Sequence, residues 1–150
     1  MENVVIVAIF CQSYVPHFGS FIKRTDLGVI PLNQEENEFP KTLFNNPADA
    51  YDVAKTLLKK YCQSSEVCLL SLKNQLRLGN KLYHFFSAEI PQDNTEINPV
   101  TGELFLKEKY RGEKISFVTL NWIFESFGNL LDEMALSLIK NEQLLASEIS

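Results

Sequence analysis

The run VVIVAIF, at residues 4–10, constrains the fold of this 150-residue chain more than any other feature. Its residues are almost all apolar and mostly β-branched, which is typical of a strand buried on both faces. The run follows the acidic Glu2 rather than a basic segment, so it does not have the pattern of a secretory signal. It therefore predicts a buried first strand at the centre of a covered sheet.

Other stretches carry weaker strand patterns, in which apolar residues alternate with polar ones or run together. QSYVPHFGS, at 12–20, is predicted to form a turn, and LGVIP, at 27–31, is a short apolar segment. Gly79-Asn80 is predicted as the turn of a later hairpin. The expected strands are 20–24, 66–72 and 81–90, with one or two more within 104–117.

The stretch NNPADAYDVAKTLLKKYC, at 45–62, has the pattern of an amphipathic helix. Asn46 is a suitable N-cap, and Pro47 suits the first helical position. Apolar residues then recur every three or four positions, so one face of the helix should be buried. That face is expected to comprise Ala50, Val53, Ala54, Leu57, Leu58 and Tyr61, with Asp52, Lys55, Lys59 and Lys60 outside it.

A long polar loop is expected at about 32–46, before this helix. Towards the C-terminus, Thr119 is suited to cap a short helix at 120–127, and apolar spacing predicts a final helix at 129–147. This order indicates an α+β fold, in which a mixed β-sheet packs between helices. We expect a single domain over 1–150, because no repeat, low-complexity tract or linker divides the sequence.

The charge balance narrows the class of partner. The net charge of −5 and the isoelectric point near 5.1 disfavour general binding to duplex nucleic acid, which depends on lysine and arginine. Cys11, Cys62 and Cys68 are scattered and predict neither a disulfide framework nor a zinc site. No apolar run approaches membrane-spanning length. These features predict a soluble, cytoplasmic protein with no membrane partner.

The order of the elements resembles that of the Nudix domain over roughly residues 2–145. In that family a strand and a hairpin lead into a glycine-rich loop and a helix, which together form the Nudix box, G-x5-E-x7-R-E-U-x-E-E-x-G with U apolar. Two later landmarks of the family have counterparts in LYHFF, at 82–86, and FVTLNWIFES, at 117–126. The resemblance implies a Nudix-like mixed sheet packed between helices.

The Nudix box itself is altered. When the helix is aligned on the apolar Leu57, Lys55-Thr56 stands where the family has Arg-Glu, and Lys59-Lys60 stands where it has paired glutamates. Cys62 replaces the closing glycine. In the upstream segment IPLNQEENE, at 30–38, Pro31 matches the family, but Leu32 and Asn33 replace its two glycines. Asn33 also lies about eight residues too far from the helix.

These substitutions change the chemistry that the resemblance implies. Nudix hydrolases use the box carboxylates to hold divalent metal ions, which neutralise a diphosphate and activate water. Two lysines in place of two glutamates repel Mg²⁺ instead. The implied function is a non-catalytic binding or interaction module, with no catalytic residue and no cofactor, whose ligand is another protein or a nucleotide bound without metal. The candidate ligand-binding residues are Lys55, Thr56, Lys59 and Lys60.

Two other functions stay open. In the first, the protein hydrolyses a nucleoside diphosphate derivative or capped RNA with relocated metal ligands, and Glu35, Glu36 and Glu38 hold Mg²⁺ or Mn²⁺. Asp49, Asp52 or Glu89 would assist. In the second, the domain is a scaffold subunit of a larger assembly, which predicts a contiguous exposed apolar patch. The ordinary explanations are a solvated polar loop for the glutamates and a favourable helix C-terminus for the paired lysines.

Individual side chains give further expectations. His84 should be a packed or hydrogen-bonded core residue, and His17 should be exposed. Cys11 and Cys68 lie in apolar strands and should be inert. Cys62 is either buried or a reactive thiol beside two lysines.

Towards the C-terminal part, a basic run is expected to be a solvated hairpin or a patch that meets an acidic partner or RNA. Trp122 is expected mainly in the core, although an exposed ring could stack on a base. The basic run consists of Lys107, Lys109, Arg111 and Lys114.

Overall fold

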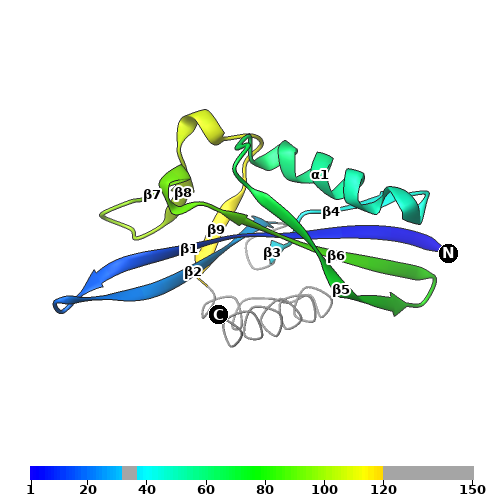
Figure 1. Ribbon diagram of the computed structural model, residues 1–150, viewed down its shortest axis with the longest axis horizontal. Coiled ribbons are helices and arrows are strands. Elements are labelled where there is room, and N and C mark those ends of the chain that lie inside the picture. The colour runs from blue at the N-terminus through cyan, green and yellow to red at the C-terminus, as the bar shows by residue number, and fades with distance from the viewer. Residues whose placement is uncertain (32–36, 120–150) are drawn as a thin grey trace.

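The computed structural model describes residues 1–31 and 37–119, apart from the side chains at 73–74. Within these residues a mixed β-sheet forms the centre of the protein, and an α-helix lies across one face of it (Figure 1). The predicted α+β class is confirmed. The helices predicted at 120–127 and 129–147, and with them Trp122, lie outside the described residues.

The main sheet has seven strands, in the order β3-β2-β1-β6-β5, with β4 paired to β1 and β9 paired to β2. Its strands are β1 (Glu2–His17), β2 (Ser20–Pro31), β3 (Asn37–Glu38), β4 (Lys41–Phe44), β5 (Cys68–Leu78), β6 (Lys81–Ile90) and β9 (Ser116–Thr119). The hairpin predicted at 66–90 is confirmed as β5 and β6, which are joined at Gly79-Asn80.

Smaller elements surround the main sheet. β7 (Thr95–Ile97) and β8 (Leu104–Leu106) form a separate two-stranded sheet. The helical elements are α1 (Ala50–Tyr61) and the short 3-10 helices η1 (Pro47–Asp49), η2 (Gln92–Asn94) and η3 (Glu108–Tyr110). No helix in the described part of the chain is long and apolar enough to cross a membrane.

β1 is the central strand that the run at 4–10 predicts. It pairs in parallel with β6 along one edge and antiparallel with β2 and β4 along the other. Because successive side chains of a strand point to opposite faces, the run divides between two hydrophobic clusters. Val4, Ile6, Ala8 and Phe10 enter one cluster, and Val5, Val7, Ile9 and Cys11 enter the other.

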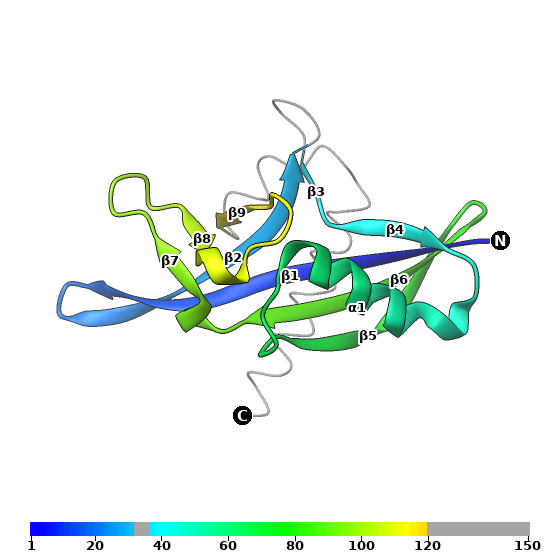
Figure 2. The same cartoon turned by 90° about the horizontal axis from the view of Figure 1, so that it is seen from above.

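α1 covers the second of these clusters and lies above β1 and β6 (Figure 2). Asn46 Oδ1 accepts a hydrogen bond of 3.1 Å from the Ala48 N–H, so it caps η1, which leads directly into α1. The predicted amphipathic helix is confirmed. Its buried residues are Ala54, Leu57, Leu58 and Tyr61, while Asp52, Lys55, Lys59 and Lys60 are exposed.

The prediction of a turn over 12–20 is wrong. β1 continues to His17, and only Phe18-Gly19 forms the turn, after which 20–31 is one continuous strand. Pro16 does not end the strand because it lies beyond Cys11, the last β1 residue paired with β6. A proline is tolerated in such an edge position, where its missing N–H interrupts no ladder.

Two short strands occupy part of the segment predicted as a polar loop at 32–46. β4 pairs antiparallel with the beginning of β1, with Val4 opposite Leu43. β3 pairs with the end of β2. Residues 37–38 and 41–44 are therefore paired strands rather than loop, and the pairing of β4 with β1 positions the site described below.

The buried histidine is as predicted, and one cysteine is not. His84 is buried between Asn3 Oδ1 and Gln75 Nε2, each 3.1 Å from a ring nitrogen, and burial lowers its pKa. Cys11 and Cys62 are buried, and burial raises the pKa of both thiols, which agrees with the buried alternative for Cys62. Cys68 lies in a strand as predicted, but it is exposed rather than packed, because it begins β5 at the edge of the sheet.

A buried ion pair in β2 gives a pH-dependent prediction. Arg24 donates two hydrogen bonds of 2.9 Å to the fully buried carboxylate of Asp26. Burial raises the pKa of Asp26, and the guanidinium opposes that rise. Arg24→Met leaves the carboxylate unpaired and should lower the free energy of unfolding by about 3 kcal/mol at pH 7.

The sign of the pH effect follows from the raised pKa. Without Arg24 the pKa of Asp26 rises further, so the folded variant binds a proton more tightly than its unfolded chain does. The difference in unfolding free energy between the wild type and Arg24→Met should therefore become smaller as the pH falls from 7 towards 5. Urea unfolding of both proteins across this range measures it, and an equal difference at every pH would refute the account.

Candidate functional site

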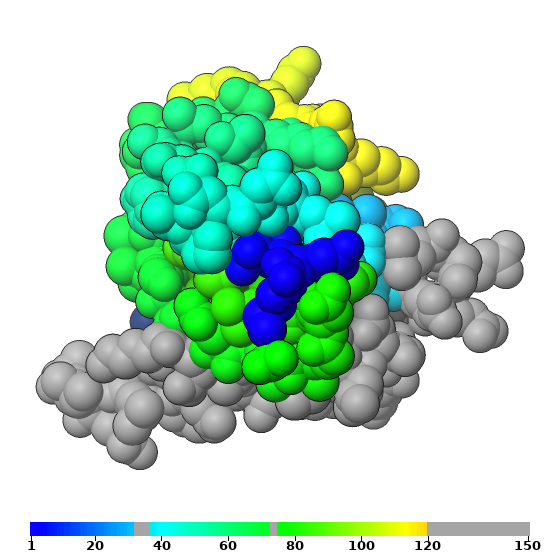
Figure 3. Space-filling view, turned by 90° about the vertical axis from the view of Figure 1, so that its right-hand side faces the viewer, coloured from blue at the N-terminus to red at the C-terminus, as the bar shows by residue number. Residues whose placement is uncertain are grey.

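A groove runs between α1 and β4, with a volume of about 700 Å³. Figure 3 views the molecule from the end where α1 and β4 lie above the first residues of β1. A hollow of this size is within the range of small-molecule sites. The residues that line this α1–β4 groove are Thr42, Leu43, Phe44, Asp52, Val53, Thr56, Leu57, Lys59 and Lys60.

Local sequence explains how the groove forms. Helical side chains three and four positions apart share a face, so Asp52, Thr56, Lys59 and Lys60 form one polar row along α1. The apolar stripe of the helix lies next to this row and supplies Val53 and Leu57. The other wall is β4, which contributes Phe44. The Phe44 ring packs edge-on against the His84 ring, with 5.2 Å between the two ring centroids. The result is a hollow with an apolar floor and a polar rim, whose two lysines outweigh the single aspartate in charge.

The two lysines on this rim differ in their surroundings. The Lys60 ammonium lies 3.5 Å from Glu113 Oε2, with both side chains largely exposed. Lys59 makes no ion pair with any described residue. The hydroxyl of Thr56 donates to the Asp52 carbonyl oxygen at 3.0 Å, which holds its side chain against the helix. Lys59 is therefore the cation most available to an anionic ligand.

The structure brings together three of the four residues predicted to bind a ligand. Thr56, Lys59 and Lys60 line the α1–β4 groove, whereas Lys55 is exposed on α1 outside its lining. Helical spacing does not separate Lys55 from this set, because position 55 lies three residues after 52 and four before 59. The lining instead extends from this row towards Val53 and Leu57, on the side away from Lys55.

The carboxylates of the relocated-metal alternative are not gathered in this groove. Glu38 lies in β3, 3.0 Å from the Lys41 ammonium, and does not line it. Glu35 and Glu36 lie outside the described residues. Of the three assisting carboxylates, Asp52 alone is in the lining; Asp49 and Glu89 are exposed elsewhere. Among the described residues there is no group of three His, Cys, Asp or Glu side chains that could hold a metal ion.

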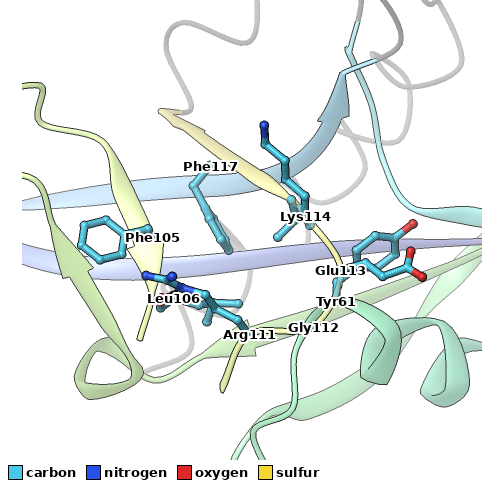
Figure 4. Close-up of a pocket in the computed structure, with 9 residues that line it drawn as sticks. Tyr61, Phe105, Leu106, Arg111, Gly112, Glu113, Lys114 and Phe117 are labelled. Atoms are coloured by element: carbon cyan, nitrogen blue, oxygen red, sulfur yellow. Dashed lines mark hydrogen bonds between the residues drawn. The ribbon is translucent and has the colours of Figure 1, made fainter. Parts of the chain in front are cut away.

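A second hollow, of about 330 Å³, lies beyond the C-terminal end of α1 (Figure 4). Arg111 reaches across it, with its Nε donating 2.7 Å to the Leu106 carbonyl oxygen and its guanidinium 5.5 Å from the centroid of the Phe105 ring. Part of the predicted basic run is thus anchored rather than freely solvated. The hollow is lined by Tyr61, Phe105, Leu106, Arg111, Gly112, Glu113, Lys114, Ile115 and Phe117.

A backbone clamp separates the two hollows. The N–H of Gly112 donates 3.1 Å to the Tyr61 carbonyl oxygen, and the N–H of Glu113 donates 2.8 Å to that of Lys60. These bonds satisfy carbonyl groups at the end of α1 that a helix leaves without internal partners. The clamp fixes the end of α1, and with it Lys59 and Lys60, to the segment before β9. Sequence analysis did not identify it.

Comparison with protein-family models and with curated proteins finds no match for the sequence. Comparison with solved structures does find the fold elsewhere. A mutT/nudix family protein from Listeria innocua superposes with a TM-score of 0.63 at 11% identity, over 99% of this chain and 96% of that chain.

Two further structures are similar. A chain of the complex between the C-terminal domain of mouse MUTYH and human PCNA has a TM-score of 0.62 at 11% identity, over 95% of this chain and 90% of that one. A C. elegans Ap4A hydrolase in a binary complex has a TM-score of 0.52 at 13% identity, over 98% and 99% of the respective chains. The chain therefore has a Nudix-like fold, as its resemblance to that family implies.

Proposed function

We propose that this Nudix-like protein is a non-catalytic binding module that holds an anionic ligand in the α1–β4 groove without a metal ion. The observation that carries the proposal is the position of Lys59 and Lys60 on the rim of a groove with an apolar floor. Ammonium groups attract phosphate or carboxylate directly, and the same charges oppose Mg²⁺. A nucleotide has the matching chemistry, and so does an acidic segment of a protein partner.

The spacing of the altered Nudix box supports this proposal. Lys55 lies 14 residues after Lys41, the distance that separates the first glycine of the family motif from its arginine. A box that begins at Lys41, where β4 starts, removes the eight-residue excess found when it begins at Asn33. In this register none of the motif's glutamate positions carries a carboxylate, because they are occupied by Pro47, Thr56, Lys59 and Lys60.

Proteins of similar fold include one in a protein complex and one that acts on a nucleotide. One similar structure is a complex of a protein domain with another protein, PCNA, and another is an Ap4A hydrolase. Fold alone does not transfer either role to this chain. The two neighbours therefore suggest a protein segment and a nucleotide as ligands to test on this groove.

A matched pair of lysine variants tests the site. Lys59→Glu should abolish the stabilisation of the protein by nucleotides or by an acidic peptide, measured by thermal melting in EDTA. A ligand at 100 times its dissociation constant stabilises a fold by roughly 2.7 kcal/mol, which melting detects easily. Lys55→Glu makes the same charge change on the same helix outside the groove and should preserve most of the shift.

The control decides the interpretation. Equal losses in the two variants would indicate a general charge effect and would contradict the proposed site. A ligand-induced shift that survives Lys59→Glu would contradict it as well. Lys59 is preferred to Lys60 for this test because Lys60→Glu would also place a carboxylate beside Glu113.

A further inference from the structure

The first hairpin of the protein extends beyond the rest of the sheet as an arm. β1 pairs with β6 only as far as Cys11, and β2 pairs with β9 only from Asp26 onwards. Residues 12–25, which we call the arm, are therefore paired chiefly with each other. Figures 1 and 2 both show it projecting away from the end that carries the N-terminus.

The arm carries large apolar side chains on all sides. Phe18 is 96% exposed, Phe21 69%, Tyr14 58% and Ile22 45%. The strand register places Tyr14 and Phe21 on one face, since their partners are Lys23 and Pro16, and Ile22 on the opposite face. Phe18 occupies the tip. Because exposed apolar side chains lie on both faces and at the tip, the arm is better suited to insertion into an apolar medium than to docking through one flat face.

The tip keeps an aromatic residue at a position that disfavours one. Phe18 has a φ of 46° and Gly19 a φ of 81°, so both central residues of the turn are left-handed. Glycine, asparagine and aspartate are preferred at such positions, and a bulky side chain there is strained. Backbone strain of this kind is concentrated at functional positions, which makes Phe18 a candidate for one.

The outer edge of β1 in the arm offers little to an added strand. A two-residue hairpin is closed by a hydrogen-bonded pair, here His17 and Ser20, so the backbone groups of Pro16 and Tyr14 point outwards. Pro16 has no N–H, and the N–H of Tyr14 donates to Gln92 Oε1 at 3.3 Å. The arm therefore presents side chains rather than free backbone donors along this edge.

The charges of the arm are basic, although the protein is acidic. No aspartate or glutamate occurs from residue 3 to residue 25, and the arm contains two cations, Lys23 and Arg24. Arg24 is neutralised by Asp26 at the base of the arm. Lys23 lies behind Phe18 and Phe21, where a long basic side chain can reach lipid headgroups while aromatic rings enter the interface.

From these features we infer that the arm binds the surface of an anionic lipid membrane. Phe18 and Phe21 enter the interfacial region, and Lys23 contacts the headgroups. A peripheral contact of this kind needs no membrane-spanning helix, and the described residues contain none. It differs from the expectation of no membrane partner, which was based only on the lack of an apolar run long enough to span a membrane. Basic and apolar contributions together are what interfacial binding requires. This inference does not depend on the α1–β4 groove.

Phe18→Asn is the sharpest test, because it separates binding from folding. Asn-Gly is a favoured pair for a turn with two left-handed residues, so the variant should melt at or above the wild-type temperature. Its binding to vesicles of phosphatidylcholine and phosphatidylserine, measured by co-sedimentation, should weaken by about tenfold or more through loss of one inserted aromatic ring. Val100→Ser, which alters a residue 90% exposed on the β7–β8 turn, should bind like the wild type.

Each alternative outcome is distinct. Binding should fall when phosphatidylserine is omitted and when salt is raised, since the headgroup contact is electrostatic. Absence of wild-type binding to anionic vesicles would overturn the inference, as would equal binding by Phe18→Asn. A dimer in sedimentation velocity that Phe18→Asn dissociates without any lipid would assign the arm to a second copy of the chain instead, and would also overturn it.

Discussion

Gly112→Ala is expected to lower the free energy of unfolding by about 3 kcal/mol or more, because the new methyl group has no space. A Cβ at Gly112 would lie 2.2 Å from the Lys60 carbonyl oxygen and 2.9 Å and 3.0 Å from backbone carbons of the same turn. These are backbone atoms, which cannot rotate away as the end of a side chain can. The clamp at the end of α1 would have to open, with loss of the two hydrogen bonds that it contains.

Gly102→Ala is the matched control for this prediction. Gly102 has a φ of 75°, and a methyl group added there would have nothing within 4 Å, so its substitution costs only backbone strain, about 1–2 kcal/mol. Urea unfolding of both variants separates the two effects. If Gly112→Ala is no more destabilising than Gly102→Ala, the clamp does not hold the helix as described.

Replacing Thr56, Lys59 and Lys60 together with glutamate should create a divalent metal site in the α1–β4 groove. The three positions lie on one face of α1 beside Asp52, and Glu113 is already within reach of position 60. Two positive charges become two negative ones, and a further carboxylate is added. Carboxylate oxygens are the ligands that Mg²⁺ and Mn²⁺ prefer, so Mn²⁺ affinity should rise by roughly 100-fold or more.

Calorimetric titration with Mn²⁺ measures this gain. The wild type and Lys55→Glu should show weak binding at most, because neither gathers carboxylates in the groove. The triple variant should also melt at a higher temperature with Mn²⁺ than with EDTA, since a ligand of the folded state stabilises it. Strong Mn²⁺ binding by the wild type would contradict the proposed loss of the metal site.

The parts of the fold that sequence predicts are those set by local periodicity. The run at 4–10 indicates a strand buried on both faces, and 45–62 indicates an amphipathic helix. Each pattern can be recognised because its whole period repeats within a short stretch of sequence. β4 is different. KTLF has only four residues, and it becomes a strand through pairing with Val4 and Val5, almost forty positions earlier. No local signal contains that partner.

The turn over 12–20 shows a related limit. Pro16 and Gly19 are both turn-forming residues, and only the second is in the turn. Whether proline interrupts a strand depends on whether its edge is paired, and that is a property of the whole sheet. The partner of β1 along this edge, β6, stops pairing at Cys11. Sequence therefore identifies a hairpin here but not the length of its arm.

The candidate site was predictable in part for the same reason. Helical spacing alone places Thr56, Lys59 and Lys60 on one face of α1. That this face borders β4, and that Lys60 meets Glu113, depends on contacts distant in sequence. The clamp at Gly112 is the extreme case, because a glycine required by close approach of another segment looks like any loop glycine until that segment is placed.

The most direct test of the proposed metal-free groove is the melting temperature of the wild-type protein with a nucleotide and dinucleotide panel, measured once in Mg²⁺ and once in EDTA. We predict that at least one anionic ligand raises the melting temperature equally in both conditions, since Lys59 and Lys60 contact it without a metal ion. A rise that requires Mg²⁺ would contradict this account and favour a hydrolase with relocated carboxylates.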